Sequence, residues 1–163
     1  MLPEQERFLV LEIGGQGCAI PIADVREIVP MAALARSPGQ PSLLEGFLNL
    51  RGVAVPVVCA ARLFDLPAPE PGMHTPLAVL RGNPWPLALL VDRVVEIASP
   101  QEVLPLRENN SFNDCARAEA VFSRRTAFVL DCGKILLENE RQCIAVLRAR
   151  AQERLEEVES LRA

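Results

Sequence analysis

The cysteines and the histidine are the residues with the widest chemical range in this chain, and their spacing does not favour a metal site or a catalytic nucleophile. The five cysteines form no Cys-x-x-Cys pair and are widely separated: Cys18, Cys59, Cys115, Cys132 and Cys143. A zinc site needs closely spaced Cys and His ligands, so we expect none. We interpret the thiols as reduced, buried, small apolar side chains. A redox sensor that uses Cys59 and Cys132 stays open as the alternative.

General acid-base chemistry has no better candidates. His74, the only histidine, lies in a Pro- and Gly-rich segment that could not hold an imidazole in place for proton transfer. Asp92 and Asp131 are isolated acids at the ends of predicted strands, and we interpret them as caps of local backbone. The sequence contains no G-x-S-x-G, P-loop or G-x-G-x-x-G motif. We therefore predict a non-enzymatic protein without a cofactor.

Charge and composition argue against several binding partners. The chain has a formal charge of −4 and an isoelectric point near 5.1, whereas nucleic acids and anionic membranes need a cationic face. Only 4% of its residues are aromatic, which does not favour a base-stacking surface. No apolar run approaches the roughly 20 residues that span a bilayer, and the first residues are polar and acidic. We expect a cytoplasmic protein that binds no nucleic acid and does not insert into the membrane.

The elements that must position any site are short strands. Apolar runs of four to seven residues are separated by Gly and Pro, a pattern typical of many short strands. In the first part of the chain we predict strands at 8–13, 18–22, 47–50 and 53–59, with a turn at Arg51-Gly52. Between them, the spacing of Val25, Ile28 and Val29 predicts a short amphipathic helical turn over 23–29.

The pattern repeats after a Pro-rich linker at 67–76. Residues 8–11 correspond to 77–80 and residues 22–28 to 91–97 at an offset of 69, and 57–59 to 129–131 at an offset of 72. Nearly constant offsets indicate two copies of one β unit. We predict a domain over 1–138 with two barrel lobes, about 8–66 and 77–137, which can exchange strands at their junction.

The tail differs from the rest of the chain. Residues 138–163 contain no Gly or Pro, and apolar residues recur every three or four positions at Ile144, Leu147, Ala151, Leu155, Val158 and Leu161. This spacing predicts a C-terminal amphipathic α-helix over 139–163. Two interpretations remain open: the helix packs on the protein's own barrels, or it pairs with a helix of another chain.

Four segments resemble one known family. The run Gly46–Val58 contains N-L-R-G followed by V-A-V-P-V, and residues 8–11 with Val25-Arg26-Glu27-Ile28 precede it. The L-L-V-D segment at 89–92 and the V-L-D segment at 129–131 follow in order. Together they resemble the chemotaxis-coupling (CheW-like) family over about residues 8 to 137. The resemblance implies an all-β fold of two SH3-like five-stranded barrels.

The resemblance also implies a function. Members are adaptors that couple chemoreceptor cytoplasmic helical hairpins to the regulatory domain of a sensor histidine kinase, in arrays at the membrane. Carried onto this sequence, it makes partner-binding candidates of Val25, Ile28, Gly46, Asn49, Arg51, Gly52, Val53, Val55, Cys59 and Arg62. We interpret Gly46 and Gly52 as bare backbone that a partner can approach. For Arg51 we favour a structural pair with Glu27 and keep a receptor carboxylate as the alternative.

The sequence also departs from the family's pattern. Cys59 stands where the family, and this chain's own second copy at Asp131, place an aspartate, and two alanines follow it. Ala118 stands near the position of a usual glycine, and the tail helix is longer than a minimal adaptor needs. We therefore expect an adaptor of a divergent or auxiliary array. A self-assembling structural module, associating through barrel edges or the C-terminal helix, is the remaining alternative.

Overall fold

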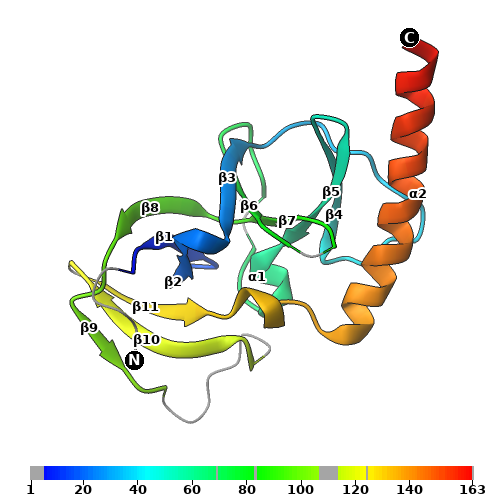
Figure 1. The fold of residues 1–163 in the computed structure, drawn as a ribbon. Coiled ribbons are helices and arrows are strands. Elements are labelled where there is room, and N and C mark those ends of the chain that lie inside the picture. Colours follow the sequence, from blue (N-terminus) through cyan, green and yellow to red (C-terminus); the bar gives the residue numbers. More distant parts are fainter. Residues whose placement is uncertain (1–5, 69, 83, 107–113, 124, 163) are drawn as a thin grey trace.

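The computed structural model describes residues 6–68, 70–82, 84–106, 114–123 and 125–162. Figure 1 shows strands gathered into two sheets, with one long helix at the C-terminal end. The predicted fold class, an all-β protein with short helices and a C-terminal helix, is confirmed. One of the sheets has six strands among the described residues instead of the expected five.

The first half of the chain forms five strands. These are β1 (Phe8–Ile13), β2 (Gln16–Pro21), β3 (Val25–Pro30), β4 (Leu44–Leu50) and β5 (Val53–Cys59). A 3-10 turn, η1 (Ile22–Asp24), connects β2 to β3, and the short helix α1 (Ala60–Leu63) follows β5.

The second half repeats this order with one additional strand among the described residues. Its strands are β6 (Pro76–Leu80), β7 (Leu87–Leu90), β8 (Arg93–Ala98), β9 (Glu102–Leu104), β10 (Ala116–Phe122) and β11 (Arg125–Leu130). The 3-10 turn η3 (Cys132–Lys134) then leads into the long helix α2 (Glu138–Arg162).

Each sheet contains strands from both halves of the chain. The six-stranded sheet has the order β8-β1-β2-β11-β10-β9, and the five-stranded sheet has the order β3-β6-β7-β5-β4. The first hairpin of each half therefore lies in the sheet that the other half completes. Two short parallel pairings make the exchange: Phe128 and Val129 of β11 against β2, and Val57–Cys59 of β5 against β7.

One predicted element is wrong. Residues 25–30 form the strand β3 and not part of a helical turn, and only Ile22–Asp24 before them is helical, as a single 3-10 turn. Because β3 pairs antiparallel with β6, its backbone groups bond to a neighbouring strand. In a strand, alternate side chains face opposite sides. Val25 is consequently buried while Ile28 is 41% exposed.

The core explains why β1 is apolar at nearly every position. Leu9, Leu11 and Ile13 face the larger core cluster, which also takes residues from the five-stranded sheet and α2. Phe8 and Val10 face a second cluster with β10 and β11, where the Phe8 and Phe122 rings meet edge to face at 5.8 Å. A strand buried on both faces needs apolar side chains on both.

Helix α2 begins on the barrels and ends away from them. Ile144 and Leu147 are buried in the larger cluster, whereas Val158 and Leu161 are 47% and 87% exposed. Figure 1 shows the last turns, in red, extending beyond the strands. Within the described residues, no helix combines the length and the apolar character that crossing a membrane would require.

Candidate functional site

The isolated acids serve as caps, as the sequence predicts. Both carboxylate oxygens of Asp92 accept hydrogen bonds from the turn after β1, from the Gly14 N–H at 3.1 Å and the Gly15 N–H at 2.9 Å. Asp131 accepts from the Gly133 N–H at 3.0 Å and caps η3. Among the described residues no cluster of three or more His, Cys, Asp or Glu could hold a metal ion.

The thiols are mostly buried. Cys18, Cys59 and Cys115 are buried, Cys132 is intermediate and Cys143 is exposed. Burial raises the pKa of both Cys115 and Cys132 to about 12, and it raises that of Cys18 further. A thiol with so high a pKa carries almost no thiolate at neutral pH, which argues against Cys132 as a redox sensor.

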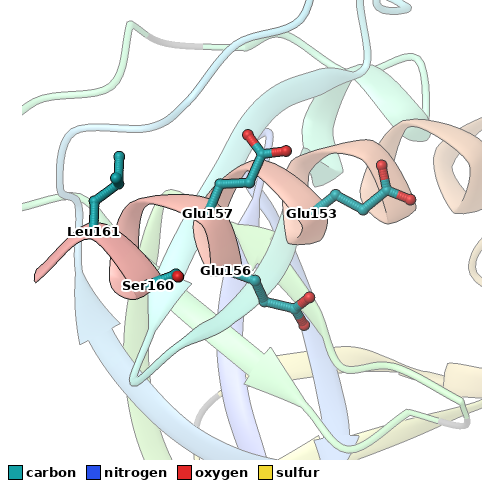
Figure 2. Close-up of a pocket in the computed structure, with 5 residues that line it drawn as sticks. All are labelled: Glu153, Glu156, Glu157, Ser160 and Leu161. Atoms are coloured by element: carbon teal, nitrogen blue, oxygen red, sulfur yellow. The ribbon is translucent and has the colours of Figure 1, made fainter. Parts of the chain in front are cut away.

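The surface hollows do not resemble a small-molecule site. The one shown in Figure 2 measures about 640 Å³ and is lined by Glu153, Glu156, Glu157, Ser160 and Leu161, all from the last turns of α2. A hollow lined by one helix has no opposite wall and cannot enclose a ligand. A second hollow of about 470 Å³ lies between η1, the turn joining β6 to β7, and η3.

The hairpin tip, residues 49–53, joins β4 to β5 through a two-residue turn. Arg51 and Gly52 both have positive φ, 52° and 87°, as a type I′ turn requires. The structure contains the ion pair with Glu27: Arg51 Nη2 donates to Glu27 Oε2 at 2.6 Å. The hydrogen bond from Arg51 lowers the pKa of Glu27. The pair ties the tip to β3, and the guanidinium is still 63% exposed.

Helix α2 covers the backbone next to this tip. Gln152 accepts from the Ala54 N–H at 2.8 Å and donates to the Gly52 carbonyl at 3.0 Å. Arg148 donates to the Ala54 carbonyl at 3.0 Å. Strand β7 pairs only with Val57–Cys59, so the start of β5 has no neighbouring strand on that side. The side chains of Gln152 and Arg148 form hydrogen bonds with the backbone groups that a neighbouring strand would otherwise bind.

Neither predicted glycine offers free backbone to another protein. Gly46 is buried, with φ +150°, and a Cβ there would lie 2.7 Å from the Ala35 carbonyl oxygen. A Cβ on Gly52 would lie 3.1 Å from a carboxylate oxygen of Glu159, and the Gly52 N–H already donates to Asn49 at 2.9 Å. The chain's own residues therefore fill the space that was assigned to a partner.

The other candidates differ in how exposed they are. Val25, Val55 and Cys59 are buried, whereas Ile28, Asn49, Arg51 and Arg62 are exposed and Val53 is half-buried. Arg62 is held in place, because it bonds the Ser42 carbonyl at 3.1 Å and the buried carboxylate of Glu45 at 3.2 Å. The exposed candidates come from β3, the hairpin tip and α1, and the structure does not gather all of them into one cavity.

Sequence reasoning missed Ile97, which is 46% exposed. It is the counterpart of Ile28 at the offset of 69. The strands that carry them, β3 and β8, are edge strands of the two different sheets. The internal repeat was sufficient to find this residue. Each half of the chain thus presents an exposed isoleucine on an equivalent edge strand.

Comparisons with known proteins identify relatives by sequence and a similar fold by structure. A family model described as the CheW-like domain matches residues 7–140. The chain is 32% identical over 90 residues to the chemotaxis protein CheW of Helicobacter pylori, covering 55% of this chain and 54% of that protein. It is 26% identical over 97 residues to the chemotaxis protein CheW of Bacillus subtilis, covering 60% and 62%. The matched part thus spans less than two thirds of these relatives.

A solved structure supports the fold. The scaffolding protein TtCheW from Thermoanaerobacter tengcongensis superposes with a TM-score of 0.71 at 20% identity, over 80% of this chain and 86% of that one. At this identity the likeness establishes the two-barrel architecture alone.

Proposed function

The chain belongs to the CheW-like domain family, and from this premise we propose that it is a non-enzymatic adaptor that couples chemoreceptors to a sensor histidine kinase. Two of its relatives are chemotaxis proteins, and one structural neighbour is a scaffolding protein. The chemistry of the described residues agrees with this role, because Asp92 and Asp131 act as caps of local backbone and burial raises the pKa values of Cys18, Cys115 and Cys132.

The observation that carries the proposal is the pair of exposed isoleucines on equivalent edge strands. Ile28 on β3 and Ile97 on β8 are 41% and 46% exposed, although most large apolar side chains of both sheets are buried. A receptor's helical hairpin presents an apolar stripe, which one apolar residue from each barrel can contact. We propose Ile28 and Ile97 as receptor contacts, in place of the buried Val25.

The exposed candidates at the hairpin tip, Asn49 and Arg51, and on α1, Arg62, are our candidates for the kinase side. Asn49, Arg51 and Arg62 are exposed, and the two arginines are fixed by ion pairs with Glu27 and Glu45. A fixed guanidinium loses less entropy when it binds a carboxylate of a partner. These contacts would be small, in the class below about 1,200 Å² that is typical of transient signalling.

We further propose that the partners belong to a divergent or auxiliary array. Cys59, at the end of β5, is 4% exposed and provides no carboxylate at that position. A kinase domain that expects an aspartate there would lose an ion pair or hydrogen bond.

The decisive test measures binding to each partner separately. Calorimetry would titrate the protein with a soluble receptor hairpin and, in another series, with the kinase regulatory domain. Ile28→Asp and Ile97→Asp should each weaken receptor binding at least tenfold and leave kinase binding unchanged, because a carboxylate would have to be desolvated in an apolar contact.

The matched control is Val103→Asp on β9, another edge strand, where the valine is 42% exposed. That change should leave both affinities unaltered. If the isoleucine variants bind the receptor hairpin as tightly as the unmodified protein does, these residues are not receptor contacts. If neither partner binds at concentrations up to about 1 mM, the coupling role is wrong.

A further inference from the structure

A stripe of exposed side chains runs along the projecting end of α2. Arg150, Arg154, Glu157 and Leu161 are spaced four, three and four residues apart and so share one side of the helix. All four are exposed. We call this set the outer stripe. It lies beside the face of α2 that Ile144 and Leu147 bury against the barrels.

The outer stripe carries both positive and negative side chains. No ion pair among the described residues involves Arg150, Arg154 or Glu157. Leu161, at the end of the stripe, is 87% exposed, the largest value among the exposed large apolar side chains. Figure 2 shows Leu161 and Glu157 projecting from the same side of the helix.

The order of these residues is self-complementary for an antiparallel helix pair. We propose that two copies of this chain associate through their outer stripes, with a two-fold axis that crosses α2 between residues 155 and 156. This arrangement places Arg154 opposite Glu157 of the second copy and Arg150 opposite its Leu161. By symmetry each contact occurs twice. Both ion pairs would form, and Leu161 would pack along the aliphatic stem of an arginine.

The surroundings of the stripe provide further apolar contact. Leu155 and Val158 line a hollow of about 200 Å³ together with Ala35 and Phe47. Arg36 and Arg154 are at its rim, and neither has an ion-pair partner among the described residues. The C-terminal part of α2 is acidic, with Glu153, Glu156, Glu157 and Glu159. Within the outer stripe, however, Arg154 of one copy faces Glu157 of the other, and this charge complementarity favours a second α2 over a partner that is cationic throughout.

Self-association through α2 should be weak. Two helices in contact over a few turns bury less than the roughly 1,200 Å² of stable interfaces. We expect a dissociation constant on the order of 100 µM, which matters where the chain is concentrated on a scaffold. The inference does not depend on the proposed coupling role, because it concerns contacts between identical chains alone.

Sedimentation equilibrium between about 10 µM and 1 mM tests the proposal. Arg154→Glu and Glu157→Arg should each raise the dissociation constant at least tenfold, because each creates two like-charge contacts across the axis. The double variant R154E/E157R exchanges the charges and should restore dimerisation. Glu102→Arg on β9, where the glutamate is exposed, is the control for a charge change of the same size and should dimerise normally.

Circular dichroism at the same concentrations checks that each variant keeps its helix. The proposal is overturned if the unmodified protein stays monomeric up to 1 mM, or if the single variants dimerise normally. It is also overturned if the double variant stays monomeric while its helix content is normal. Binding of an added acidic amphipathic peptide by an otherwise monomeric protein would assign the stripe to a different occupant.

Discussion

At the scale of single residues, Glu12 shows how the six-stranded sheet uses charge. Its carboxylate accepts from Arg93 of β8, at 2.7 and 3.1 Å, and from Arg125 of β11, at 2.8 Å. The hydrogen bonds from Arg93 and then Arg125 lower the pKa of Glu12 from 4.5 to about 2. One side chain on β1 therefore links strands that are three positions apart in the sheet.

This lowered pKa predicts a pH-dependent contribution to stability. A carboxyl whose pKa is lower in the folded state stabilises the protein above its unfolded pKa of 4.5, and this contribution is lost as the pH falls towards 2. Glu12→Gln should reduce the free energy of unfolding by about 1 kcal/mol at pH 7. Urea unfolding should show the difference shrinking near pH 3. A difference that is the same at both pH values would contradict the assigned pKa, and Glu102→Gln serves as the unpaired control.

The cysteines lead to a second prediction at this scale. Three of the five are buried, as the sequence suggested, but Cys143 is exposed on α2 because it falls outside the apolar spacing of that helix. A thiol reagent added to the native protein should modify one cysteine quickly and the rest only on unfolding. Cys143→Ser should abolish the fast phase. Fast modification of Cys132 would revive the redox alternative.

At the scale of elements, the sequence predicted those whose signals are local. Residues 8–13 are nearly continuously apolar and bounded by glycine, and they form β1. The Arg51-Gly52 turn and the flanking strands also follow from their residues, because a turn with two positive φ values favours glycine. The apolar spacing of residues 144–155 likewise predicts the face of α2 that packs on the barrels.

Strand β3 shows where local signals mislead. Val25, Ile28 and Val29 have the spacing of a helical face, yet the residues extend, because pairing with β6 outweighs local propensity. Burial alternates along β3 from Val25 to Pro30, but apolar and polar residues do not alternate there in the sequence. The roles of Gly46 and Gly52 were mistaken for a different reason. Glu159 is distant from Gly52 in sequence, and Ala35 meets Gly46 through a loop, so both contacts come from the tertiary fold.

At the scale of elements, the turn at the hairpin tip leads to a prediction about stability. Arg51 has φ 52°, a conformation that costs most residues about 1 kcal/mol and glycine almost nothing. Arg51→Ala and Arg51→Gly both remove the ion pair with Glu27, so their difference isolates the backbone strain. We expect Arg51→Gly to be more stable than Arg51→Ala by about 1 kcal/mol in urea unfolding. Equal stabilities would mean that the turn relaxes when the arginine is removed.

At the scale of the whole molecule, the internal repeat indicated two units but could not reveal how they share strands. The offset of 69 relates β1 to β6, yet β1 lies in the sheet completed by β8–β11 and β6 in the sheet completed by β3–β5. Each barrel could have included the first hairpin of its own half of the chain, and the local sequence pattern would have been the same. The choice depends on the parallel pairings β2–β11 and β5–β7, which are contacts between distant segments.

The exchange leaves part of β5 dependent on α2, and this dependence gives the last prediction. Gln152 bonds the Ala54 N–H and the Gly52 carbonyl, so Gln152→Ala would leave both without that partner. Each lost bond costs about 0.5–1.5 kcal/mol, and we expect a loss of about 1–3 kcal/mol in the free energy of unfolding. The fluorescence of Trp85, the single tryptophan and 7% exposed, would report the urea transition.

Gln142→Ala is the matched control, since Gln142 lies on the same helix and bonds only the side chain of Glu138. It should change stability by less than about 0.5 kcal/mol. Gln152→Ala should also aggregate sooner, because the uncovered backbone of β5 can pair with another chain. If both variants unfold at the same urea concentration, the helix covers β5 without stabilising it. The tail would then serve association between chains and contribute little to the fold.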